Sequence, residues 1–465
     1  MIERANSLGL SSCPLESDFN AESSYFRCLS APITLQWEVT PFCNERCVHC
    51  YNFWREDRDE NFLGGRDLLA VYERASREIV ENRVFHVTIT GGEPLIALKQ
   101  VYPYLKYLSD NDVDISFNTN LTLLDGERVE MLKSLGVRSI LTSLISGNAD
   151  LNDRLANRRN THRDVTRGIR LAINEGFLVA VNMVVTKKNL FDIFSTAEYV
   201  KGLGVTAFSA TKASTPINSP DFSQYVLSKD EFRFMINELL RIRDKLDLHV
   251  DSLEFYPMCF FDTQEARDFA GNRICNAGKT ACTIGFDGQV RPCSHASQVY
   301  GSVMDSGGLA EAWINLNSWR TDEYIPSQCN SCVVRTWCRG GCRTEAYSAF
   351  GDLSAPDPYC DFSHNVLPQT PTKKVDVDVF SKYFFHPGIK SRRESFGGIL
   401  FVTPVRWTGV NMELYNFFQS CYGKSFYLRD LAFALGLKSE VDVINTVRFL
   451  LSRSLVRKGG EKNES

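Results

Sequence analysis

Short apolar runs alternate with amphipathic stretches along the first half of the chain. Helical periodicity is clear over residues 67–83 and again over 127–136, where Gly136 can end the helix. The apolar runs between such stretches are short and bounded by polar turns, as buried strands are. The expected strands are residues 33–40, 84–90, 114–119, 139–144, 178–185 and 205–210.

This alternation predicts an α/β fold. Strands separated by helices lie parallel and are joined by right-handed crossovers. Six strand–helix units are too few for a closed eight-stranded barrel, so we expect an open, partial (β/α)6 barrel. In such folds the chemistry lies at the carboxyl ends of the strands.

Apolar periodicity fades from about residue 259 to residue 360, where cysteine, glycine and short polar turns dominate. A segment with so little apolar pattern needs another source of stability, and metal ligation supplies it. A linker with two prolines follows at 365–378. Beyond it, a strand pair bent at Gly397–Gly398 and three helical patterns predict a small α+β, winged-helix-like domain; the helical patterns are 412–421, 426–436 and 440–456.

The predicted organisation therefore has four parts. They are an N-terminal segment 1–32, a partial barrel 33–250, a cysteine-rich domain 251–365 and a small C-terminal domain 366–465.

Composition narrows the class of protein. The 465 residues are 43% hydrophobic and 23% charged, which is typical of a globular protein. The net charge of −4 gives no reason to expect a surface that binds nucleic acid or membranes. No apolar stretch is long enough to span a bilayer, and the first residues lack the apolar core of a signal peptide. We therefore expect a cytoplasmic protein without nucleic-acid or membrane partners.

Fifteen cysteines change this picture. In a large chain without an export signal, thiols in tight clusters indicate metal binding rather than disulfides. Four of them, Cys13, Cys28, Cys259 and Cys421, stand apart from the clusters and are expected to be ordinary thiols.

The first cluster follows the first expected strand. Cys43, Cys47 and Cys50 have the spacing C-x3-C-x2-C, followed by the aromatic Tyr51. Three thiolates can hold a [4Fe–4S] cluster but leave one iron without a protein ligand, where a small molecule can chelate. A structural zinc site with His49 as the fourth ligand is the alternative interpretation.

This motif resembles the signature of the radical S-adenosylmethionine (SAM) superfamily. The resemblance implies that SAM binds the open iron through its amino and carboxylate groups. One electron from the cluster then cleaves SAM to a 5′-deoxyadenosyl radical, which abstracts a hydrogen atom from the substrate.

The second expected strand ends in Gly91, Gly92, Glu93 and Pro94. Two glycines leave backbone groups accessible to a small zwitterion. The four residues resemble the superfamily's GGEP motif, which implies contact with the SAM amino group.

Three further strand ends carry polar residues that resemble SAM-contacting positions of relatives: Asn120, Ser143 and Asn182. Relatives often have Thr-Asn-Gly after the third strand, whereas Leu121 replaces the glycine here. Each of these residues could equally be an ordinary polar residue at a strand end.

The second cysteine block carries eight thiols and Gly288. Seven of the thiols form the array C-x12-G-x4-C, gap, C-x2-C-x5-C-x3-C, gap, C, and the eighth, Cys282, lies between the first cysteine of the array and Gly288. Eight thiolates fit two fully ligated [4Fe–4S] clusters, although C-x2-C pairs also occur in zinc ribbons. The array resembles the SPASM extension of radical SAM enzymes that modify peptides and proteins. That resemblance implies a nearer auxiliary cluster held by Cys275, Cys282, Cys293 and Cys342, and an outer one held by Cys329, Cys332, Cys338 and Cys360. Cys282 is the least certain of these ligands, because the core pattern needs only seven cysteines.

The C-terminal domain resembles the recognition element of enzymes that modify ribosomally made peptides. The similarity depends on the order of strands and helices and on the turn at residues 394–397. It implies that a leader peptide adds as a strand to an exposed sheet edge. Arg392 and Arg393 could bind an acidic leader or form a solvated basic pair, and a packing domain without a ligand is the alternative.

These features predict an enzyme with SAM and three [4Fe–4S] clusters. The function expected is radical modification of a ribosomal precursor peptide, such as a cross-link, with reducing electrons from a flavodoxin or ferredoxin. The alternatives are an oxidoreductase acting on a protein side chain, as in anaerobic sulfatase maturation, and a non-catalytic iron–sulfur electron carrier. The sequence names no catalytic acid or base.

Overall fold

The computed structural model describes residues 29–52, 54, 67–216, 220–271, 273–362 and 376–459. Contacts between residues divide the chain into two compact units. The larger unit is residues 34–370, and the smaller combines residues 1–33 with 371–465. Among the described residues, no helix is both long and apolar enough to cross a bilayer.

A nine-stranded open sheet forms the centre of the larger unit, in the order β7-β6-β5-β4-β3-β2-β1-β8-β9. Neighbouring strands from β7 to β8 are parallel, and β9 is antiparallel to β8. The predicted α/β class with a parallel sheet is confirmed. The strands are β1 (Thr34–Glu38), β2 (His86–Thr90), β3 (Asp114–Asn118), β4 (Ser139–Ser143), β5 (Leu178–Val185), β6 (Ala207–Lys212), β7 (His249–Asp251), β8 (Ala281–Ile284) and β9 (Val290–Arg291).

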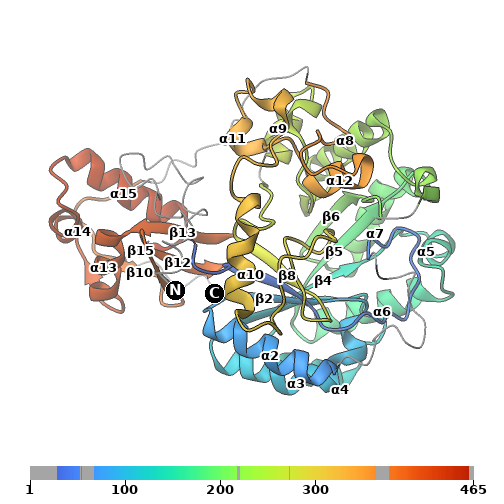
Figure 1. Cartoon of the computed structure of the whole chain (residues 1–465), viewed down its shortest axis with the longest axis horizontal. Coiled ribbons are helices and arrows are strands. Elements are labelled where there is room, and N and C mark those ends of the chain that lie inside the picture. The colour runs from blue at the N-terminus through green and yellow to red at the C-terminus, as the bar shows by residue number, and fades with distance from the viewer. Residues whose placement is uncertain are drawn as a thin grey trace. The chain divides into compact units, whose positions relative to one another are not determined.

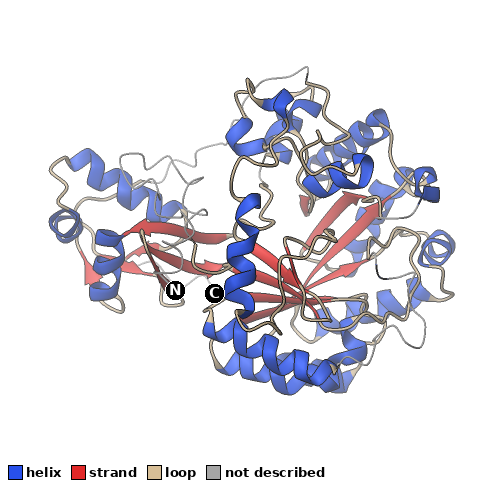
Figure 2. Ribbon diagram, viewed as in Figure 1, coloured by secondary structure: helices blue, strands red, loops and turns tan. Residues whose placement is uncertain are grey.

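Helices cover this sheet, as Figures 1 and 2 show. Helix α2 packs on α3, α3 on β3 and α4, and α8 on β6 and β7. The helices of this unit are α2 (Leu68–Glu81), α3 (Pro94–Asp110), α4 (Gly126–Ser134), α5 (Ala149–Ala156), α6 (Thr161–Asn174), α7 (Ile193–Leu203), α8 (Lys229–Lys245), α9 (Gln264–Ala270), α10 (Gly308–Asn315), α11 (Arg335–Cys338) and α12 (Arg343–Phe350).

The sheet extends beyond the six strands expected from the sequence. Strand β8 comes from the cysteine-rich segment and pairs in parallel with the free edge of β1, where Leu35 lies opposite Cys282. Trp37 of β1 is fully buried, with Ile89 of β2 on one side and Ile284 of β8 on the other. The start of the cysteine-rich segment is therefore part of the same sheet as the barrel strands.

The described residues of the smaller unit form two three-stranded sheets and three α-helices. One sheet has the order β14-β10-β15 and the other β11-β12-β13. The elements are β10 (Tyr383–Phe385), β11 (Lys390–Glu394), β12 (Gly397–Thr403), β13 (Arg406–Asn411), α13 (Met412–Cys421), β14 (Ser425–Phe426), α14 (Leu428–Leu435), α15 (Glu440–Ser452) and β15 (Val456–Lys458).

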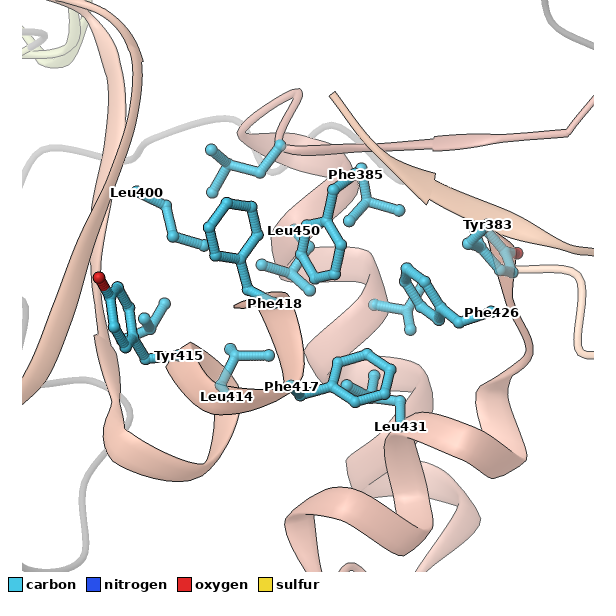
Figure 3. Packing of buried hydrophobic residues seen from close by; sticks show 14 of the residues in the cluster. Tyr383, Phe385, Leu400, Leu414, Tyr415, Phe417, Phe418, Phe426, Leu431 and Leu450 are labelled. Carbon is cyan, nitrogen blue, oxygen red and sulfur yellow. The ribbon is translucent and has the colours of Figure 1, made fainter. Parts of the chain in front are cut away.

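An aromatic-rich core holds this unit together. Figure 3 shows Phe385 of β10, Phe417 and Phe418 of α13, and Phe426 of β14 in one cluster. The Phe385 and Phe418 rings meet edge to face, with centroids 5.1 Å apart. Burial of such rings stabilises a small domain strongly, because each removes a large apolar area from water.

Arg392 of β11 is buried and joins the N-terminal segment to this unit. Its guanidinium donates to the carbonyl oxygens of Ala31 (2.6 Å) and Pro32 (2.9 Å) and pairs with Glu394 at 2.7 Å. Glu394 in turn accepts from the Ser30 amide at 2.9 Å. The suggestion that Arg392 binds an acidic leader peptide is therefore wrong, since its guanidinium is occupied within the fold; Arg393 is exposed.

Substitution of Gly398 in β12 tests how tightly this unit is packed. A Cβ at this position would lie 2.1 Å from the Tyr415 ring of α13, so we expect Gly398→Ala to destabilise the unit by about 1–3 kcal/mol. Gly388→Ala is the matched control, because its nearest neighbour is the His386 side chain at 3.3 Å. Urea unfolding followed by near-ultraviolet circular dichroism measures both, and equal midpoints for the two variants would contradict the expectation.

Candidate functional site

The three cysteines of the first motif lie in the loop that follows β1, at the carboxyl end of the central sheet. The loop is attached to α5 through two backbone hydrogen bonds, from Arg46 to Ala156 (3.2 Å) and from Val48 to Leu155 (2.9 Å). Apolar packing of Cys47 and Val48 on Leu155 supports the same contact. The motif is thus held on the carboxyl end of α5.

The environment of these thiols disfavours a free thiolate. Burial raises the pKa of Cys43 to about 12 and raises the pKa of Cys47 well above its usual value. The carboxylate of Glu45 adds to this effect on both thiols, and the Cys47 thiol donates to Glu45 Oε2 at 3.4 Å. Cations that bind here must displace protons, and binding relieves the mutual repulsion of the three sulfurs.

Three neighbouring thiols are a donor set that a [4Fe–4S] cluster accepts. No group of three or more histidine, cysteine or acidic side chains among the described residues is close enough to hold one metal ion. A four-iron cluster binds each cysteine on a different iron, so its ligands lie farther apart than the ligands of one ion. The three thiols nevertheless act on one another electrostatically, as expected of neighbours around one loop.

Gly91 and Gly92 pack directly against the cysteine loop. A Cβ on Gly91 would lie 2.4 Å from the Thr40 oxygen, and one on Gly92 would lie 2.1 Å from the Phe42 oxygen. The amides of Gly92 and Glu93 donate to these same two carbonyl oxygens, each at 2.7 Å.

Asn52, which follows the three cysteines in the sequence, adds a third contact to this turn. Its side-chain amide donates to the Gly91 carbonyl oxygen at 3.1 Å. The glycines were expected to leave backbone groups accessible to a small ligand. In the structure, the amides of residues 92 and 93 and the carbonyl of residue 91 are engaged with the cysteine loop.

Glu93 joins the tips of two strands. Its fully buried carboxylate accepts from the Thr119 hydroxyl (2.6 Å), the Asn120 amide (2.8 Å) and the Leu95 amide (2.9 Å). The last contact caps α3, and Pro94 occupies the first helical position, where its missing N–H costs nothing. Burial raises the pKa of Glu93, although the three donors favour its charged form.

Asn120 lies beside the cysteine loop. Its side-chain amide donates to Asn44 Oδ1 at 2.9 Å, and its carbonyl oxygen accepts from the Thr122 hydroxyl at 2.7 Å. Leu121 takes a left-handed backbone conformation (φ 56°), which glycine adopts without strain. Leucine therefore occupies a backbone conformation here that glycine would adopt at a lower conformational cost.

Ser143, the last residue of β4, lies opposite Asn182, which lies within β5 and not at its end. Ser143 is exposed, and Asn182 Oδ1 accepts from the Thr211 hydroxyl at 2.9 Å. The structure thus brings these polar side chains to the same carboxyl edge of the sheet as the cysteine loop.

An aromatic contact joins the first cysteine motif to the second block. The Tyr51 ring stacks on the His295 ring, with centroids 3.8 Å apart and an interplanar angle of 26°. Tyr51 follows Cys50 directly, and His295 lies two residues after Cys293. The two cysteine regions therefore meet at a pair of half-buried rings.

Four cysteines predicted for the outer cluster line a single cavity of about 120 Å³. They come from the segment 327–362, and Cys259, which was set aside as an ordinary thiol, lines the same cavity. The cavity thus has five thiols: Cys259, Cys329, Cys332, Cys338 and Cys360.

The nearer set is divided. Cys275 acts electrostatically on the thiols of both Cys293 and Cys342. Cys282 lies inside β8, where burial raises its pKa to about 12 and the charged group that acts on it is Arg320. Cys275 is thus linked electrostatically to Cys293 and Cys342, and Cys282 is buried in the strand that pairs with β1.

A buried ion cluster at the carboxyl end of β6 was not expected from the sequence. Lys212 is 2% exposed, and its amino group lies 3.0 Å from Glu345 and 3.3 Å from Glu254. A buried cation needs such partners, because desolvation is costly. The sequence shows that Lys212 ends an apolar run, which could have indicated a buried cation. No sequence pattern connects this lysine to Glu254 and Glu345, which lie 42 and 133 residues further along the chain.

Comparison with known proteins agrees with this geometry. The profile of the radical SAM superfamily matches residues 37–200. The mycofactocin maturase MftC of Mycobacterium tuberculosis is 28% identical, over 73% of this chain and 85% of its own. The AdoMet-dependent heme synthase of Methanosarcina barkeri is 26% identical, over 71% of this chain and 97% of its own.

Two further proteins are similar. The PqqA peptide cyclase of Bradyrhizobium diazoefficiens is 25% identical, over 71% of this chain and 87% of its own. The crystal structure of Streptococcus suis SuiB bound to the precursor peptide SuiA has a TM-score of 0.55 at 19% identity, over 77% of this chain and 88% of that one. The matched residues contain both the cysteine loop and the turn that holds it, so this chain carries a radical SAM domain over residues 37–200.

Proposed function

We propose that this protein modifies a ribosomally made precursor peptide by radical chemistry. The observation that carries the proposal is the cysteine loop at the carboxyl end of a parallel sheet, in one chain with a separate unit in which the described residues leave one side of β13 without a paired strand. The relatives named as a peptide cyclase and a mycofactocin maturase support it, as does the likeness to SuiB.

A radical SAM domain implies SAM and one [4Fe–4S] cluster, and we propose Cys43, Cys47 and Cys50 as its ligands. SAM and the cluster, when bound, would supply a 5′-deoxyadenosyl radical that takes a hydrogen atom from the substrate. Gly91, Gly92 and Asn52 hold the loop in place for this cluster, through the contacts described above.

Residues toward the same edge of the sheet are the proposed SAM site: Gly91, Gly92, Glu93, Pro94, Asn120, Ser143 and Asn182. Glu93 fixes the tips of β2 and β3 relative to each other, since its carboxylate binds groups of both. This rigidity is what positioning of a small zwitterion requires.

The second cysteine block is proposed to hold two auxiliary [4Fe–4S] clusters. Cys275, Cys293 and Cys342 would serve the nearer one, and the cavity lined by Cys329, Cys332, Cys338 and Cys360 the outer one. A flavodoxin or ferredoxin is the proposed reductant.

Cys282 provides a test of the nearer ligand set. We expect Cys275→Ala to lower the iron content by up to about a third, the share of one cluster among three, and Cys282→Ala to leave it unchanged. The reason is that Cys282 is buried inside β8, where Arg320 is the charged group that acts on it, whereas Cys275 acts electrostatically on Cys293 and Cys342. Iron and acid-labile sulfide per chain measure this, and an equal loss in both variants would restore Cys282 to the ligand set.

Leader recognition is the proposed role of the smaller unit. Within the described residues, β13 pairs with β12 on one side and has no strand on the other. An extended peptide can add to such an edge through its main chain. The three strands β11, β12 and β13 are followed by three helices, in the order expected of a peptide-recognition domain.

The test is anaerobic co-expression with each short open reading frame beside the gene, followed by intact-mass analysis of the peptide. Loss of hydrogen, or of a larger fragment, that requires Cys43, Cys47 and Cys50 would support the proposal. An unmodified peptide, with 5′-deoxyadenosine still formed, would overturn it and direct the search to a protein side chain or, given the heme synthase relative, a tetrapyrrole.

A further inference from the structure

Arginine is concentrated in one short segment of the larger unit. Residues 154–170 contain six arginines and one acidic residue, Asp164, which is a formal charge of +5 in a chain whose total is −4. The segment runs from the end of α5 through the following turn and along α6. All of its arginines are exposed except Arg158, which is half-buried; they are Arg154, Arg158, Arg159, Arg163, Arg167 and Arg170.

Few carboxylates neutralise this charge. Asp164 serves two arginines, since it pairs with Arg158 at 2.8 Å and with Arg163 at 3.1 Å. Arg167 donates to two carbonyl oxygens of the loop between β3 and α4, at 2.7 and 2.8 Å, and these contacts leave its charge in place. Asp153, one position before the segment, accepts from two backbone amides at the start of α6. No ion pair within the described part of the chain includes the other three arginines.

The arginines of α6 share one face of that helix. Arg163, Arg167 and Arg170 are spaced by four and three residues, which places their side chains on the same side of an α-helix. Together with Tyr199 of α7 they line an open hollow of about 460 Å³. The hydroxyl groups of Tyr199 and Thr166 lie 3.0 Å apart, and α6 packs on both α5 and α7, which Figure 1 shows on one side of the larger unit. The basic surface is therefore supported by three helices that contact one another.

The same segment holds the cysteine loop. Leu155 and Ala156, which lie between the first two arginines of the segment, accept the two backbone hydrogen bonds from the loop. The loop itself reaches the protein surface there, since Arg46 is exposed, Phe42 is 41% exposed and the three cysteines are half-buried. A protein that approaches the cysteine loop from this side therefore meets a strongly positive surface.

We propose that the arginine surface, defined as residues 154–170, is the docking site of an acidic electron-transfer protein that reduces the proposed cluster. The inference rests on the proposed function, because it assumes that a cluster at Cys43, Cys47 and Cys50 accepts the electron. The donor loses one electron and the cluster gains it, with no atom transferred. Complementary charge speeds such an encounter and orients the two partners.

An acidic peptide substrate is the other kind of partner that a positive surface attracts. The place of the arginines favours the electron donor, because a donor has to come close to the cluster itself, whereas a peptide has to reach SAM. The segment is attached directly to the loop that carries the proposed ligands.

The experiment uses the full-length protein, reconstituted anaerobically, and the double variant Arg159→Glu/Arg170→Glu. These two arginines form no ion pair among the described residues, so reversing their charge breaks none there. The matched control is Arg429→Glu/Lys438→Glu, which makes the same change of charge at exposed positions of the smaller unit. The affinity for a flavodoxin of net negative charge is measured at low and at physiological ionic strength. The rate of 5′-deoxyadenosine formation is measured with that flavodoxin and, separately, with dithionite.

We expect the arginine variant to lose about tenfold or more in flavodoxin affinity and in flavodoxin-driven rate at low ionic strength. The difference from the wild type should shrink as salt is added, because salt screens exposed charges. The dithionite-driven rate should stay unchanged, since a small reductant needs no docking surface. An arginine variant with the flavodoxin affinity of the wild type, or a control variant with an equal loss, would overturn the inference.

Two further results would also overturn it. A dithionite-driven rate that falls together with the flavodoxin-driven rate would show that the segment supports the cysteine loop rather than the donor. Weaker modification of a precursor peptide under dithionite, with the flavodoxin affinity intact, would assign the surface to the peptide. If the wild type forms no 5′-deoxyadenosine with either reductant, the proposed function fails, and the affinity measurement still decides whether the arginine surface binds the donor.

Discussion

Replacing Cys43, Cys47 and Cys50 together by alanine is expected to abolish 5′-deoxyadenosine formation. These thiols are the proposed ligands of the cluster that reduces SAM, and in the structure they lie in one loop at the carboxyl edge of the sheet. Without them no iron is held where SAM would bind. The measurement is chromatographic quantification of 5′-deoxyadenosine after anaerobic incubation with SAM and dithionite.

The second cysteine block should be unaffected by this change. Its thiols lie on other segments, so the triple variant is expected to keep about two thirds of the iron. Cys421→Ala should match the wild type in both readouts. If the wild type itself forms no 5′-deoxyadenosine, the electron-carrier hypothesis replaces the enzyme hypothesis.

Gly92→Ala is expected to have the largest effect of any single substitution outside the ligands. Its Cβ would lie 2.1 Å from the Phe42 carbonyl oxygen, which is backbone and cannot turn aside. The loop must therefore move, and with it the hydrogen bond from the Glu93 amide and the neighbouring Cys43. Displacing groups that orient metal ligands costs about 10–100-fold in metal affinity or activity, and we expect a loss of that size.

Gly126→Ala is the control for this substitution, because a Cβ at Gly126 would meet no atom within 4 Å. Both glycines precede or begin a helix, so a general effect of adding a methyl group would appear in both. The rate of 5′-deoxyadenosine formation and the iron content measure the outcome. Equal rates for Gly92→Ala and Gly126→Ala would show that the turn does not position the cysteine loop.

The strands and helices of the larger unit followed closely from sequence pattern. Buried parallel strands have apolar runs that are recognisable on their own, and β1 to β6 lie where those runs do. Strand β7 was missed because only residues 249–251 form it, and β8 and β9 were missed because cysteine, glycine and polar residues obscure their pattern. A short strand forms only when a neighbouring strand pairs with it, and the sequence pattern of the short strand does not show which strand that is.

The sequence by itself determined the chemistry. Spacing of three thiols within eight residues confines them to one loop, and Gly-Gly-Glu-Pro after the next strand is a local signal that folding cannot rearrange. Such signals survive because neighbours in sequence remain neighbours in space.

Only the tertiary structure decided which distant residues meet. It placed Cys259 in the outer cavity and Cys282 inside a strand, and it buried Arg392 against the N-terminal segment. These residues are separated from their partners by tens to hundreds of positions, so composition and spacing carry no information about the pairing. Packing fixes such contacts, because it minimises exposed apolar area and unpaired buried charge over the whole fold.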